Sequence, residues 1–157
     1  MKKIAILTLV LMLVFALAAC GNTKPTQLGT SDLSILLPDG YASVEDDMDE
    51  DQVAYFYKDD NSIDFDVYQW EKGDEYTLES EANYFATEYG TTATAVSVNG
   101  IGGYKYVSTE DYEGNTYTVV NYMFEDDTYI VEISFWTVDN DAEYKAVDEI
   151  INTLKKN

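Results

Sequence analysis

The sequence predicts an α+β fold, in which one antiparallel β-sheet is flanked by two amphipathic helices. Three observations predict it. Most of the chain after residue 32 consists of short segments in which apolar and polar residues alternate, the pattern of strands with one buried face. Two segments, within 77–90 and 139–154, instead repeat their apolar residues every three to four positions, as amphipathic helices do. The order along the chain is strands, helix, strands, helix, and a sheet covered by both helices buries both apolar stripes.

The first predicted strand covers residues 33–37 and ends at the Pro-Asp-Gly turn 38–40. A dense acidic loop at 45–51 precedes two β-rich segments, 53–58 and 62–70. Only Asp59, Asp60 and Asn61 separate these segments, so they are predicted to form a hairpin.

The first predicted helix begins after Thr77, which can act as the N-cap, and Gly90 closes it. Its apolar stripe consists of Leu78, Ala82, Phe85, Ala86 and Tyr89.

Four further strands are predicted to complete the sheet, joined by turns rich in glycine, asparagine and aspartate. The strands are 93–98, 104–110, 116–125 and 128–138, and the turns are 99–103, 111–115 and 126–127.

The final helix is predicted to be capped by Asp139 or Asp141, with Lys155 and Lys156 close to its negative end. Its stripe consists of Val147, Ile150, Ile151 and Leu154.

The first residues have the layout of a secretory signal. Lys2 and Lys3 precede an apolar run at 4–19, which is shorter than the roughly 20 residues that a spanning helix needs. Leu17-Ala18-Ala19-Cys20 resembles the lipobox of bacterial lipoproteins. The resemblance implies a diacylglyceryl group on the Cys20 sulfur and cleavage before Cys20, and two acyl chains anchor a protein firmly. The alternative is an uncleaved signal anchor in which Cys20 is incidental.

These features predict three parts: a signal peptide at 1–19, a lipidated tether at 20–31 and a single domain at 32–157. The expected location is the extracytoplasmic face of the cell membrane. Cys20 is the only cysteine, so the domain cannot form an internal disulfide and must be stabilised by a packed core.

Three short segments resemble the PsbP-like, Mog1-like and DcrB-like group of small domains. They are Leu37-Pro38-Asp39-Gly40-Tyr41, Asn99-Gly100-Ile101-Gly102-Gly103-Tyr104-Lys105 and Ile150-Ile151-Asn152-Thr153-Leu154-Lys155. The resemblance covers nearly the whole chain after the signal and rests on turns and core positions. It implies an αβα sandwich and a non-enzymatic accessory or binding role.

The chain is strongly acidic. After residue 19 seven lysines stand against 30 acidic residues, a net charge of −23, and there is no arginine. Nucleic acid requires clustered basic residues, so it is excluded as a partner, and an acidic lipid surface also repels the domain. Membrane affinity must therefore come from the lipid, and an envelope protein or a cationic partner suits the charge.

The residue types that are absent limit the chemistry. The chain has no histidine, and the resemblance assigns its one cysteine to the lipid. Ser-His-Asp and Cys-His catalysis, His-ligated zinc and Cys-ligated clusters are thereby excluded, and no cofactor is expected.

Asp64 and Asp66 are the candidate pair for a carboxylate-dependent hydrolase. They lie two residues apart on a strand, about 7 Å from each other on one face. The alternation with Ile63, Phe65 and Val67 predicts instead that both carboxylates are exposed to solvent.

Asp47, Asp49 and Asp51 are the candidate calcium ligands. An EF-hand loop starting at Asp47 would need glycine and glutamate where the chain has Gln52 and Lys58. Only weak calcium association is therefore predicted for this loop, and a purely solvated loop is the alternative.

Tyr68 and Trp70 are the candidate ligand-binding residues, in a chain with 14 tyrosines and two tryptophans. They share the face of their strand with Asp64 and Asp66. Exposed aromatic rings can stack on sugars or peptides, whereas rings covered by the second helix are structural. The function predicted from the sequence is a lipid-anchored, non-catalytic binding or accessory module, with a hydrolase or a weak calcium-binding protein as alternatives.

Overall fold

The computed structural model describes residues 24–157, except for 45–47, 59–62, 74–75 and 137. The predictions for the signal segment, for Cys20 and for Asp47 lie outside the described residues. Within the described part of the chain, no helix has the length and apolar character needed to cross a bilayer.

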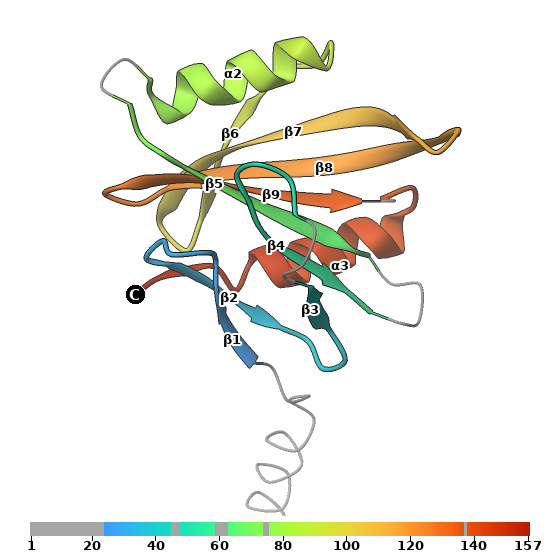
Figure 1. Cartoon of the computed structure of the whole chain (residues 1–157), viewed down its shortest axis with the longest axis horizontal. Coiled ribbons are helices and arrows are strands. Elements are labelled where there is room, and N and C mark those ends of the chain that lie inside the picture. The colour runs from blue at the N-terminus through green and yellow to red at the C-terminus, as the bar shows by residue number, and fades with distance from the viewer. Residues whose placement is uncertain (1–23, 45–47, 59–62, 74–75, 137) are drawn as a thin grey trace, which may run out of the picture.

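The α+β architecture is confirmed: a seven-stranded antiparallel sheet lies between two helices (Figure 1). Its strand order is β3-β4-β5-β9-β8-β7-β6, and a small sheet of order β1-β2-β10 lies on the α3 side. The helices are α2 (Leu78–Glu88) and α3 (Asp141–Ile151). The strands are β1 (Lys24–Gln27), β2 (Leu33–Leu37), β3 (Ala42–Val44), β4 (Gln52–Tyr57), β5 (Phe65–Glu71), β6 (Thr94–Val98), β7 (Ile101–Tyr112), β8 (Asn115–Glu125), β9 (Tyr129–Trp136) and β10 (Lys155–Lys156).

The α3 side of the large sheet carries the main hydrophobic core. Alternate residues of β5 and β9 point to this side, because successive side chains of a strand lie on opposite faces. Phe65 contacts Phe56 and Phe135 with ring centroids 4.9 and 5.0 Å apart. Fully buried members of this core include Leu33, Ile35, Val67, Phe124, Val131, Ile133, Val147 and Leu154.

The α2 side carries a smaller cluster, and the predicted cap of α2 is confirmed. The Thr77 hydroxyl accepts from Ser80 N at 3.1 Å, and Ser80 Oγ accepts from Thr77 N at 2.9 Å. Gly90 follows the helix with φ at +68°, a conformation that glycine adopts without strain. The buried residues of this cluster are Leu78, Ala82, Ala86, Tyr106, Met123 and Ile130.

Neither Asp139 nor Asp141 caps α3, so that prediction is wrong. Asn140 is the N-cap: its Oδ1 accepts from the amides of Ala142 and Glu143 at 3.0 and 3.2 Å. Glu143 Oε2 accepts from Asn140 N at 3.1 Å and completes a capping box. Asp139, Asn140 and Asp141 have similar capping strength, so residue type alone does not select among them.

Lys155 and Lys156 lie beyond the helix rather than at its negative end. The helix stops at Ile151, and β10 pairs with β2, with Lys155 opposite Ser34. Leu154 is fully buried between the two elements, which fixes this exit from the helix.

Two predicted turns are shorter than expected. Asn99 and Gly100 alone connect β6 to β7, with φ of +51° and +83°, a pair of positive φ values typical of a tight hairpin. Gly102 and Gly103 belong to β7. A Cβ on Gly103 would lie 2.5 Å from a Phe124 ring carbon, so glycine is needed there for close packing and not for a turn. The turn predicted at 111–115 is also shorter. It consists of residues 113 and 114 alone, because β7 and β8 pair as far as Tyr112 and Asn115.

The predicted tether at 20–31 is also too long. Lys24–Gln27 forms β1, which pairs with β2, and Leu28 is fully buried with its amide bonded to Leu33 O at 2.9 Å. Leu28 is the one apolar residue in a polar segment, and its burial in the main core places the end of this segment inside the fold.

Candidate functional site

The α2 side of the large sheet is only partly covered, and the uncovered part is hollowed. α2 packs on Tyr106, Met123 and Ile130 and leaves the adjacent part of the sheet open. Two adjoining cavities of about 480 and 610 Å³ lie there and share Tyr68 and Trp136 among their lining residues. We call the two cavities together the cleft.

Strand register brings polar residues distant in sequence into one row across the floor of the cleft. Asp66 of β5 lies opposite Ser134 of β9, and Ser134 lies opposite Asn121 of β8. Asn121 in turn lies opposite Tyr106 of β7. In the next row Tyr68 lies opposite Glu132. Five buried polar residues of the large sheet therefore share this face, whereas Gln69 lies on the other: they are Asp66, Ser108, Asn121, Glu132 and Ser134.

Asp66 is a fixed hydrogen-bond acceptor. Only 6% of it is exposed, its Oδ1 accepts from Gln52 Nε2 and its Oδ2 from Trp136 Nε1, both at 2.5 Å. Burial raises the pKa of Asp66 above its ordinary value, and these two hydrogen bonds oppose that effect because they favour the charged form. The prediction of a solvent-exposed Asp66 is therefore wrong, because Trp136 and Gln52 cover it.

Asp64 is half-buried beside it and lines the larger cavity. Its Oδ2 accepts from the Tyr55 hydroxyl at 3.0 Å. A general acid needs an oxygen free to carry and release a proton. Both Asp66 oxygens face N–H donors, so Asp66 is arranged to accept hydrogen bonds and not to deliver protons.

Glu132 is a second deeply buried carboxylate of the cleft, with 7% exposed. The Tyr106 hydroxyl donates to its Oε1. Burial raises the pKa of Glu132 to about 7, and the charge of Glu110 adds to the shift while the Tyr106 hydrogen bond reduces it. Among the described residues no other group donates to Glu132, and no fully buried side-chain oxygen lacks a partner. Its Oε2 is therefore accessible from the cavity of about 480 Å³ that Glu132 lines.

Sequence reasoning did not single out Glu132, Tyr106 or Glu110. The available signal was the composition of one strand face, where Glu132 and Ser134 lie between the bulky Ile130 and Trp136. Two polar residues between two bulky apolar residues indicate a strand face that is covered by packing at both ends and reached by a cavity between them. The Tyr106 partner, 26 residues away, is visible only in the folded sheet.

Aromatic rings line the cleft on several sides. Trp70 packs against Phe85 of α2 with ring centroids 5.7 Å apart, and Tyr89 stacks on Tyr106 at 6.2 Å. Tyr68 is half-buried between the two cavities. The structure thus places Tyr68 in the open part of the face and Trp70 partly under the helix.

The described part of the acidic loop, Asp49 to Asp51, lies at the rim of the cleft. Asp51 has φ at +68°, and its carbonyl accepts from Gln69 N at 2.8 Å. Asp49 exchanges hydrogen bonds with Gln52, between Asp49 N and Gln52 Oε1 at 3.0 Å and between Gln52 N and Asp49 O at 3.1 Å. Among the described residues, no three carboxylates are grouped as metal ligands, and Asp47 is outside that range.

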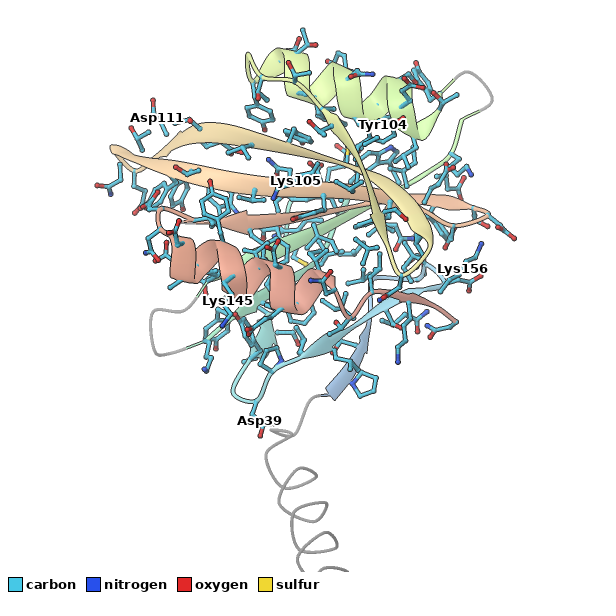
Figure 2. The ribbon with its side chains drawn as sticks, turned by 180° about the vertical axis from the view of Figure 1, so that it is seen from behind. Asp39, Tyr104, Lys105, Asp111, Lys145 and Lys156 are labelled. Carbon is cyan, nitrogen blue, oxygen red and sulfur yellow. The ribbon has the colours of Figure 1, made fainter. Side chains whose placement is uncertain are left out.

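The cleft is strongly negative. None of the described residues that line its two cavities is a lysine. Lys105 lies on the opposite side of β7, over the rings of Tyr122 and Tyr144, whereas Tyr104 lies toward α2 (Figure 2). The acidic lining residues are Asp49, Glu50, Asp51, Asp64, Asp66, Glu81, Glu110 and Glu132.

Solved structures share the fold. The solution structure of cyanobacterial PsbP (CyanoP) from Synechocystis sp. PCC 6803 is 12% identical, with a TM-score of 0.68, over 88% of this chain and 96% of that one. LpqN of Mycobacterium tuberculosis, involved in cell envelope biogenesis, is 10% identical, with a TM-score of 0.58, over 85% and 90%. A protein of Bacteroides thetaiotaomicron VPI-5482 is 19% identical, with a TM-score of 0.59, over 83% of this chain, and the match spans about half (49%) of that protein.

No family model matches the chain, and no curated protein matches it. The PsbP-like part of the resemblance is confirmed at the level of the fold, and the Mog1-like and DcrB-like parts stay predictions.

Proposed function

We propose that this chain is a non-catalytic binding or accessory module, held at the extracytoplasmic face of the cell membrane by a lipid on Cys20, and that the cleft is its binding site. One observation carries the proposal: an open cleft lined by aromatic rings and by the buried carboxylate Glu132, to which only one group donates among the described residues. Ligand sites are concave and combine apolar or aromatic walls with placed polar groups, and this cleft combines aromatic rings with carboxylates.

The membrane anchor in this proposal is supported by the lipobox-like Leu17-Ala18-Ala19-Cys20. LpqN, which has the same fold, acts in cell envelope biogenesis, in agreement with an envelope location. The non-catalytic role is supported by Asp66, whose two oxygens are both occupied by N–H donors and give no general acid.

The anchor is tested by expressing the full chain in a bacterium supplied with radiolabelled palmitate. We expect label on the processed protein and recovery in the membrane fraction, and Cys20→Ala should lose both. Unlabelled full-length protein in the cytosol would refute the anchor.

The binding role is tested by incubating the purified full chain in detergent with a bacterial envelope extract, and by native mass spectrometry of what it retains. Tyr68→Ala should abolish retention. Tyr84→Ala is the matched control, because Tyr84 is 59% exposed on α2 and does not line the cleft. If the wild-type protein retains no compound, the cleft is not a binding site.

A further inference from the structure

We infer that the cleft binds a small organic ammonium ion, with the charged group on Glu132 and the carbon skeleton against the tyrosine rings around it. This inference rests on the proposed binding function and names the chemical class of its ligand.

Glu132 supplies the first argument. Only 7% of Glu132 is exposed to solvent. Among the described residues, only the Tyr106 hydroxyl donates a hydrogen bond to it. Because the rest of this carboxylate is removed from water, a donor or a cation at its accessible Oε2 interacts with it more strongly than with an exposed carboxylate. An ammonium group supplies both positive charge and N–H donors to the accessible Oε2.

In the described part of the chain, no basic side chain lines the cleft to neutralise its carboxylates. Eight acidic residues and no lysine line the cleft in the described part of the chain. Lys72, Lys145 and Lys156 form ion pairs with acidic residues that do not line the cleft, namely Glu125, Glu149 and Asp127. A cavity walled by one sign of charge concentrates counter-ions of the other sign.

The rings around Glu132 decide between an organic cation and a metal ion. Tyr68, Tyr89 and Tyr106 line the same cavity as Glu132, and the Tyr106 hydroxyl donates to it. Aromatic faces attract alkylammonium ions within about 6 Å of the ring centre. A calcium ion needs six to eight oxygen ligands, and the described residues provide no group of three carboxylates to start such a shell.

The size of the cleft sets the size of the ligand. The cavity that Glu132 lines has about 480 Å³, within the range of small-molecule sites, and it adjoins the cavity of about 610 Å³ that contains Asp64 and Asp66. A ligand with two ammonium groups can therefore have one on Glu132 and the other in the adjoining acidic cavity.

The test is isothermal titration of the full chain in detergent with putrescine, spermidine and choline at low ionic strength. The neutral analogue 1,4-butanediol and calcium chloride serve as the comparison probes. We expect at least one ammonium probe to bind, and Glu132→Gln, which keeps the side-chain shape, to weaken that binding about tenfold to a hundredfold. Tyr68→Leu should weaken it about threefold to tenfold through lost ring contact.

Glu88→Gln is the matched control. It removes the same charge from an exposed position on α2 outside the cleft and should leave the affinity unchanged. Circular dichroism melting establishes that each variant is folded. Should Glu132→Gln not fold, Tyr68→Leu alone decides the location of the site.

Three outcomes overturn the inference: no ammonium probe binds, calcium or the neutral diol binds in its place, or the folded cleft variants bind like the wild-type protein. Retention of a neutral compound from the envelope extract, without ammonium binding, would refute the ligand class and leave the binding function intact. If the protein retains no compound from the envelope extract, both the ligand class and the binding function are refuted.

Discussion

The two faces of the large sheet are built by the same strands and differ in almost every physical property. On the α3 side, large apolar side chains such as Phe65, Phe124 and Phe135 are fully buried. On the α2 side, the alternate residues of those strands include Asp66 and Glu132, which line an open cleft. Because side chains alternate along a strand, one face can be sealed for stability while the other stays polar and accessible. The cost of burying carboxylates is offset by the core behind them.

The two helices also differ in the amount of apolar surface that they bury. α3 buries Val147, Ile150 and Ile151, whereas α2 buries Leu78 and two alanines. Less apolar area holds α2 in place, so the helix beside the cleft is expected to open more easily than the helix over the core.

Substitution of a core residue on the sealed face should have the largest effect. Phe135→Ala is expected to lower the free energy of unfolding by about 3–5 kcal/mol, since it leaves a cavity next to Phe65 and Tyr122. Urea denaturation measures the loss. Trp136→Phe changes the next residue, on the open face, and removes the N–H donor to Asp66 together with part of the ring. An equal loss in both variants would contradict the division between the faces.

On the open face, the largest expected effect is a change in how the free energy of unfolding depends on pH. The pKa of Glu132 is raised from 4.5 to about 7 in the fold. A raised carboxyl pKa contributes stability below about pH 4.5, and this contribution is lost as the pH rises through about 7. Glu132→Gln should therefore reduce the fall in unfolding free energy over this interval by up to roughly 3 kcal/mol.

Several groups surround that carboxyl and interact with its charge. Tyr106 donates to Glu132, Glu110 repels it, and Tyr68 and Tyr89 lie within range of its charge. Burial also raises the pKa of Glu110, so some pH dependence should persist in the variant. Urea denaturation at a series of pH values measures the slope. An unchanged slope in Glu132→Gln would show that Glu132 does not titrate as described.

The matched caps of the two helices should give the smallest effect. Thr77→Ala and Asn140→Ala each remove an N-cap acceptor, a change worth about 1 kcal/mol of helix stability. For Asn140→Ala we expect the loss in global unfolding, because α3 is part of the main core. For Thr77→Ala we expect it chiefly as faster amide hydrogen exchange in α2, with little change in global stability. The same global loss from both variants would mean that α2 is as firmly held as α3.

Local patterns in the sequence predicted much of the fold. Alternation located the strands, the hairpin of β4 and β5 was correct, and Thr77 and Gly90 marked the ends of α2. These features depend on residues that are neighbours in the chain. The choice of Asn140 over its two aspartate neighbours, and the position of Gly103 inside β7, depend on tertiary packing instead.

The candidate site was predicted only in part, for the same reason. Tyr68 and Trp70 were singled out, and both line the cleft. The burial of Asp66 could not be predicted, because it is caused by Trp136, which lies 70 residues further along the chain. Glu132 could not be predicted for the same reason. Its burial is caused by the neighbouring strands and by α2, and not by its own segment.

The small sheet has a mechanical consequence for a chain that is pulled from its N-terminal side. Lys24, the first residue of β1, lies opposite Leu37, the residue at which β2 continues into the domain. A pull on Lys24 therefore acts at the open end of this antiparallel pair, where its hydrogen bonds break one after another and not all at once. β1 would unzip from β2 before the seven-stranded sheet is disrupted, which lengthens the connection to the domain and leaves the cleft intact.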